Sequence, residues 1–152
     1  MAEFSAIAQQ TVNPGESIIF TATIVDDLTS YLRHSDETGE FLLSGNLPYN
    51  GCPCRRRNTV VYPAAFGANI AVPTGETVGE ISVAIAVDGT TQPATVMRVT
   101  PAAVEQFFNV SRTKDVEIWR GCCQSISIRN TSTIPILVQE ATLDIDQPIY
   151  NV

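Results

Sequence analysis

The fold is decided by the stretch Arg120-Gly-Cys-Cys-Gln-Ser-Ile-Ser-Ile-Arg-Asn-Thr-Ser-Thr-Ile-Pro-Ile-Leu-Val-Gln-Glu-Ala-Thr-Leu-Asp-Ile145. Ile126 and Ile128 alternate with polar residues, and this alternation is typical of a β-strand with one apolar face. Residues 130–133 (Asn-Thr-Ser-Thr) are turn formers, and a second alternating stretch begins at Ile134. The pattern predicts a β-hairpin that completes a β-sandwich.

The second strand of this stretch changes the parity of its apolar positions. They are even-numbered up to Val138 and odd-numbered from Ala141 onward. One extra residue at Gln139-Glu140 restores the inward face, which is the effect of a β-bulge. We therefore expect a bulge there, with Asp144 and Asp146 pointing outward after it.

The rest of the chain continues the short strands. Residues 81–87 alternate most cleanly, Asp88-Gly89 is a hairpin signal, and residues 94–99 are the expected returning partner. Pro63 is expected to separate a strand at 59–62 from another at 66–72, and residues 101–107 are the single helical candidate. About ten short strands and at most one short helix predict an all-β antiparallel sandwich, with residues 1–152 as a single domain.

Composition narrows the classes of function. Of the 152 residues, 44% are hydrophobic and 16% are charged, and the formal net charge is -7. Nucleic-acid binding needs clustered cations, so nucleic acid is not an expected partner. No apolar run reaches the length of a membrane span, and the N-terminus lacks the pattern of a signal peptide. We expect synthesis in a cytoplasm and no membrane partner.

The strand at 81–87 lacks charge on both faces. Its apolar residues point one way, while Ser82, Ala84 and Ala86 point the other way. An uncharged outer face of small residues indicates contact with a neighbouring subunit. These three residues are therefore the candidates for a subunit interface.

The four cysteines form two close pairs, Cys52-Pro-Cys54 and Cys122-Cys123. A disulfide within either pair would be strained, so bridges between the pairs or between chains are the disulfide alternative. Free thiols are a second interpretation, favoured by the missing signal peptide. A structural zinc ion bound by all four thiolates is a third, although the spacing is not that of the usual zinc motifs.

The remaining candidates are partner-binding residues. Arg55, Arg56 and Arg57 are the single basic cluster and suit phosphate, an acidic protein surface or the carboxylates of another subunit. Trp119 is a candidate for an exposed aromatic that binds sugar or protein. His34 is the only histidine, and it is far in sequence from both cysteine pairs, so we expect no catalytic dyad and no enzyme.

Two groups of segments resemble known families. Residues 36–45 (Asp-Glu-Thr-Gly-Glu-Phe-Leu-Leu-Ser-Gly), residues 69–73 (Asn-Ile-Ala-Val-Pro) and the terminal stretch resemble the jelly roll of complement globular heads and tumour-necrosis-factor-like domains. Residues 66–89, residues 99–110 and Gly121-Cys-Cys with its Arg-Asn-Thr-Ser-Thr turn resemble short proteins encoded by phages and prophages of gut bacteria. That second likeness covers roughly residues 30–145.

These resemblances imply a jelly roll that assembles as a homotrimer, with no catalytic residues. They lead to a functional expectation: a non-enzymatic phage virion protein, specifically a trimeric decoration or cement protein on the capsid. Its partners would then be its own copies, the major capsid protein or other virion proteins. The alternative is a receptor- or glycan-binding head of a phage fibre or a bacterial surface protein.

Overall fold

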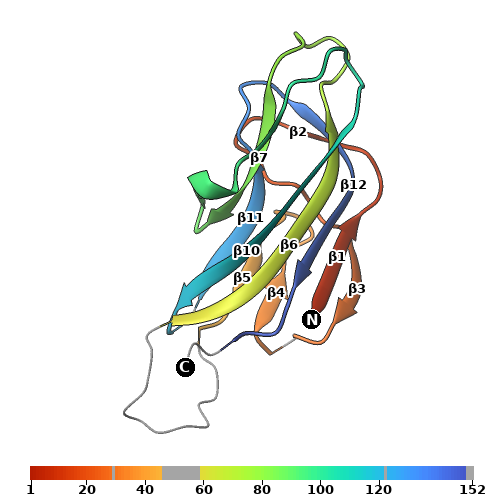
Figure 1. Ribbon diagram of the computed structural model, residues 1–152. Coiled ribbons are helices and arrows are strands. Elements are labelled where there is room, and N and C mark those ends of the chain that lie inside the picture. The colour runs from red at the N-terminus through yellow and green to blue at the C-terminus, as the bar shows by residue number, and fades with distance from the viewer. Residues whose placement is uncertain (29, 46–58, 122, 150–152) are drawn as a thin grey trace, which may run out of the picture.

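The computed structural model describes residues 1–28, 30–45, 59–121 and 123–149. These residues form twelve β-strands and a 3-10 turn at Pro93–Thr95, arranged as two antiparallel sheets that stack face to face (Figure 1). Among them, no helix has the length and apolar character needed to cross a membrane. The predicted all-β sandwich of jelly-roll type is confirmed.

Sheet A holds the longest strands. Its order is β10 (Phe108–Trp119), β6 (Thr59–Ala71), β12 (Ile136–Ile145), β1 (Ala2–Ala6) and β3 (Ala22–Asp26), and β2 (Gln10–Val12) also pairs with β12. Sheet B has the order β4 (Leu32–His34), β5 (Phe41–Leu43), β11 (Gln124–Asn130), β7 (Ile81–Val87) and β8 (Thr90–Thr91), and β9 (Met97–Val99) also pairs with β7. In Figure 1, β10 and β6 cross in front of β11, so the view is onto the outer face of sheet A.

The core lies between the sheets and follows from the alternation of the strands. Inward positions of β6, β7, β11 and β12 are buried apolar residues, most of them branched aliphatic or aromatic, with alanine at a few positions of β6 and β12. Phe4, Phe20, Phe41 and His34 form an aromatic cluster at one edge, with ring centroids 4.4–5.5 Å apart. Such offset and edge-to-face contacts add to the burial of apolar area.

The predicted hairpin at 120–145 is wrong. Strands β11 and β12 belong to different sheets: β11 pairs with β5 and β7, while β12 pairs with β1, β2 and β6. The turn at 131–135 therefore carries the chain across the sandwich. Both strands still point their isoleucines into the same core, but from opposite sheets. Alternation cannot distinguish these two arrangements, because it sets only the face that a strand buries.

Asn130 holds this crossover in place. Its side chain is 1% exposed, and its amide donates to the carbonyl oxygens of Val12 and Ile134, both at 2.9 Å. Its Oδ1 accepts the N–H of Ser132 at 2.8 Å. Strand pairing within sheet B ends where the chain leaves that sheet. There, the three hydrogen bonds of this buried amide tie the crossover to its neighbours.

The predicted bulge is confirmed. The register between β12 and β6 shifts between Gln139 and Thr142, and Glu140 adopts a left-handed backbone with φ of 52°. The Asp88-Gly89 turn is also confirmed, with φ of 48° and 78° at its two residues. Positive φ at both central residues is the geometry that joins adjacent twisted strands.

Two other expectations are wrong. Residues 101–107 form bends and turns rather than a helix. Pro63 does not divide two strands, because β6 runs through it without a break. The Pro63 oxygen accepts the N–H of Asp146 at 2.8 Å, so the proline nitrogen faces the same side, where β12 has already ended at Ile145. The missing N–H of proline therefore removes no ladder bond.

Candidate functional site

The outer face of β6 carries only short or compact side chains. Pro63, Ala65, Gly67 and Asn69 point away from the core, and each is partly exposed, whereas Tyr62, Ala64, Phe66 and Ala68 point into it and are buried. Strand β6 lies between the edge strand β10 and β12, so this stripe of short side chains runs beside one edge of sheet A. The sequence showed the same alternation at 59–71, but the interpretation of two separate strands concealed it.

A groove of about 430 Å³ lies over this stripe. We call it the β6 groove, and its lining residues are Met1, Pro63, Ala64, Ala65, Thr113, Lys114, Asp115, Asp144 and Asp146. The strand register sets its walls. Asp115 of β10 is the cross-strand partner of Pro63. Thr113 of β10 and Asp144 of β12 lie on either side of Ala65. The groove thus has an uncharged floor, with carboxylates on both sides and Lys114 on the side of β10.

The charged residues that line the groove are the cation Lys114 and three carboxylates, those of Asp115, Asp144 and Asp146. Among the described residues, the ion pairs are Arg98 with Glu80 and Arg129 with Glu40, so no carboxylate of the β6 groove forms one. The Oδ1 atom of Asp144 is buried without a hydrogen-bond partner. Glu3 is the cross-strand partner of Asp144, which adds a second negative charge beside it. The outward direction expected for Asp144 and Asp146 is what the structure shows.

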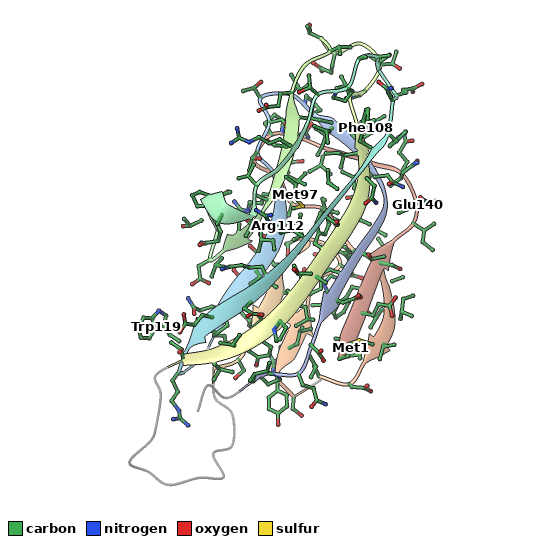
Figure 2. All side chains as sticks on the ribbon, in the orientation of Figure 1. Met1, Met97, Phe108, Arg112, Trp119 and Glu140 are labelled. Carbon is green, nitrogen blue, oxygen red and sulfur yellow. The ribbon has the colours of Figure 1, made fainter. Side chains whose placement is uncertain are left out.

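Two further features lie on the same face. Beyond one end of the groove, Asn69 accepts a hydrogen bond from Asn109 at 3.2 Å and donates one to Glu140 at 2.7 Å, which joins three strands. At the other end, Trp119 is 65% exposed and projects from the end of β10 (Figure 2). The exposure predicted for Trp119 is therefore present, and its role in binding stays a prediction.

The three residues predicted at a subunit interface, Ser82, Ala84 and Ala86, are covered within the single chain, at 7%, 0% and 0% exposure. Arg129 lies opposite Ala84, and its side chain extends over the sheet toward Gly89. The Ser82 hydroxyl bonds that of Thr131 at 2.7 Å. The premise that this face needs a second subunit was wrong, because long and polar side chains of neighbouring elements fill it.

His34 is packed rather than exposed. Its ring stacks on Phe41 with centroids 4.4 Å apart, and its Nε2 lies 2.7 Å from the Phe20 carbonyl oxygen. The Phe4 ring lies beside both rings, with its centroid 4.9 Å from that of His34. A ring held by two aromatic neighbours and a carbonyl oxygen is poorly placed to accept a proton from a nucleophile on another element.

Cys123 is disulfide-bonded, so it is not a free thiol. Cys52, Cys54 and Cys122 lie outside the described residues, as do Arg55, Arg56 and Arg57. A disulfide sulfur is not a thiolate, and the predicted four-thiolate zinc site would require this bond to be reduced. Within the described residues, no group of three or more histidine, cysteine or acidic side chains is placed to hold a metal ion.

Comparison with known proteins supports the fold. No family model matches the sequence, and no curated protein matches it. The globular domain of zebrafish complement 1qA protein superposes with a TM-score of 0.60 at 12% identity, covering 98% of this chain and 96% of that one. A sugar-binding EclA C-terminal domain gives a TM-score of 0.40 at 11% identity, covering 93% of this chain and 79% of that one. The expected likeness to complement globular heads thus holds at the level of fold, and the resemblance to phage proteins stays a prediction.

Proposed function

We propose that this chain is a non-enzymatic virion structural protein, a homotrimeric jelly roll that decorates a bacteriophage capsid. It would act through its surfaces: protomers pack against one another, and the trimer binds the major capsid protein or another virion protein. The phage-like motifs at residues 66–89 and 99–110 motivate the virion assignment. The packing of His34 and the disulfide at Cys123 support a function without catalysis.

One observation carries the proposal of self-association. Among the described residues, the outer face of sheet A presents a long, partly exposed stripe of small residues along β6, and exposed apolar residues accompany it. Trp119 is 65% exposed, and Ile149, which bridges to Val61 of β6, is 53% exposed. A flat face with short side chains lets a partner approach closely, and exposed aromatic residues are enriched where proteins meet. Among the described residues, this face is more exposed than that of Ser82, Ala84 and Ala86, and we therefore assign the interface to it.

The test combines mass with fluorescence. Native mass spectrometry and light scattering at micromolar concentration are expected to give three times the mass of one chain. Trp119 is the only tryptophan in the chain, so its emission reports on this face alone. We expect a blue shift of the emission as the concentration rises into the range of assembly. A monomeric mass throughout that range contradicts the trimer, and no co-sedimentation with empty capsids contradicts decoration.

A receptor- or glycan-binding head is the second candidate. The exposed Trp119 favours it, because an aromatic ring stacks on a sugar while nearby carboxylates accept hydrogen bonds from its hydroxyls. The measurement is a glycan array with the natural chain and Trp119→Ala. Saturable binding that is lost in Trp119→Ala supports this function. A flat response together with binding to empty capsids excludes it in favour of decoration.

A further inference from the structure

Two loops form the end of the sandwich that lies away from both termini (Figure 1). One joins β6 to β7 and spans residues 72–80, and the other joins β9 to β10 and spans residues 100–107. Strands β7 and β9 pair at the base of both loops, and Glu105 donates its N–H to the Val72 oxygen at 2.7 Å. These contacts hold the two loops side by side, and we call them the distal loops.

The distal loops expose apolar side chains. Val78 and Val104, one on each loop, are 39% and 37% exposed, and Phe108 at the start of β10 is 37% exposed at the same end (Figure 2). Single exposed apolar residues are normal on a protein, whereas several that gather in one place mark a contact with another molecule. We call this region the distal surface and define it by these three residues together with Glu76 and Glu105.

The charge of the distal surface limits what can cover it. Glu76, Glu80 and Glu105 are the acidic residues of the distal loops, and these loops contain no lysine or arginine. Arg98 forms an ion pair with Glu80 at 3.7 Å. Among the described residues, neither Glu76 nor Glu105 forms one. A second copy meeting this surface through its own would bring carboxylates against carboxylates, and an anionic lipid surface would be repelled, whereas a basic protein surface is attracted.

The second distal loop is tied down before any partner arrives. The side-chain oxygen of Gln106 accepts the N–H of Ala102 at 2.9 Å, which closes the loop on itself. Glu105 adopts a left-handed backbone with φ of 56°, and its N–H is the one bound to the Val72 oxygen. A loop fixed at two points loses little conformational freedom on binding, and this favours a specific contact.

We propose that the distal surface docks a segment of another protein in which lysine or arginine flanks an aliphatic or aromatic side chain. The apolar side chain packs on Val78, Val104 and Phe108, while the cations pair with Glu76 and Glu105. The inference goes beyond the proposed self-association, because the distal loops lie past the end of β6 and the partner is not a second copy. Only the identification of that partner as a virion protein rests on the proposed function.

The test begins with random peptides displayed on yeast and selected on the immobilised full chain. We expect the enriched peptides to combine lysine or arginine with aliphatic or aromatic residues. One enriched peptide, labelled with fluorescein, is then followed by anisotropy at low and high NaCl. Its binding should weaken with salt and fall at least about fivefold in Glu76→Gln with Glu105→Gln, and also in Val78→Ser with Val104→Ser.

Two matched controls separate this surface from the rest of the chain. Asp36→Asn with Glu37→Gln makes an equal charge change at an exposed turn of sheet B, and Ile7→Ser with Ile24→Ser removes exposed apolar residues elsewhere. Both should leave peptide binding unchanged. Thermal melts check that every variant is folded, and the glutamine pair, which keeps the size of each side chain, supplies the test if the serine pair unfolds.

Selection that enriches no peptide, or enriches acidic or wholly polar ones, overturns the proposal, and so does binding that is indifferent to both distal pairs. Binding to phosphatidylcholine vesicles that is lost in Val78→Ser with Val104→Ser overturns it in favour of lipid. A mass of the assembly that falls in the same variant overturns it in favour of contact between copies. Lost peptide binding at unchanged mass supports it, and a monomer that binds the peptide refutes the trimer alone.

Discussion

The side chain of Asn130 is expected to contribute strongly to stability, and Asn130→Ala tests this. The substitution removes two donors and one acceptor from a site that is 1% exposed. The Val12 oxygen lies in a buried hydrogen bond, while the bonds to Ile134 and Ser132 are partly buried. An orphaned buried group costs roughly 1–3 kcal/mol, and a hydrogen bond that water can replace about 1 kcal/mol. The expected loss in the free energy of unfolding is therefore about 3 kcal/mol.

Urea denaturation followed by circular dichroism measures this loss. The midpoint should fall while the slope with denaturant stays constant, and the melting temperature should drop by roughly 6–12 °C for a chain of this size. Asn109→Ala is the matched control: its side chain bonds Asn69 at an exposed site where water can replace it, so the free energy should change much less, by about 0.5 kcal/mol. A loss below about 1 kcal/mol for Asn130→Ala would show that the crossover is held by core packing and not by this amide.

Three further outcomes are expected. Gly45→Ala should destabilise the fold by more than about 2 kcal/mol in thermal melts, since its Cβ would lie 2.0 Å from the Trp119 backbone oxygen, whereas Gly79→Ala, with open space around it, should be neutral. At the bulge, Glu140→Val should cost about 2 kcal/mol more than Glu140→Gly, because a branched residue fits a φ of 52° poorly; equal melting temperatures would contradict this. Cys123 should resist alkylation in the native protein, and reduction should lower the melting temperature; a labelled Cys123 in non-reduced protein refutes the disulfide.

Once the strands are known, the alternation of residues along each strand predicts which side chains of the site point outward. The outward direction of Asp144 and Asp146 was predictable from alternation and the bulge, and the exposure of Trp119 from the inward direction of Val116 and Ile118. The groove was not predictable, because it needs Asp115 on β10 and Asp144 on β12 to flank the same strand. Asp115 is 52 residues from its partner Pro63, and Asp144 is 79 residues from its partner Ala65, so no local signal specifies this neighbourhood.

By itself, the sequence determined which side chains each strand turns inward, where the bulge falls and where the Asp88-Gly89 turn lies. These are local properties, set by the two-residue repeat of a strand and by the backbone that a turn residue tolerates. Only the tertiary structure decided that β11 and β12 lie in opposite sheets and that the chain covers Ala84 and Ala86 itself. The reason is that a strand buries the same face whether it pairs with the next strand in one sheet or lies opposite it in the other sheet. The choice of partner therefore depends on all the strands that compete for each sheet edge.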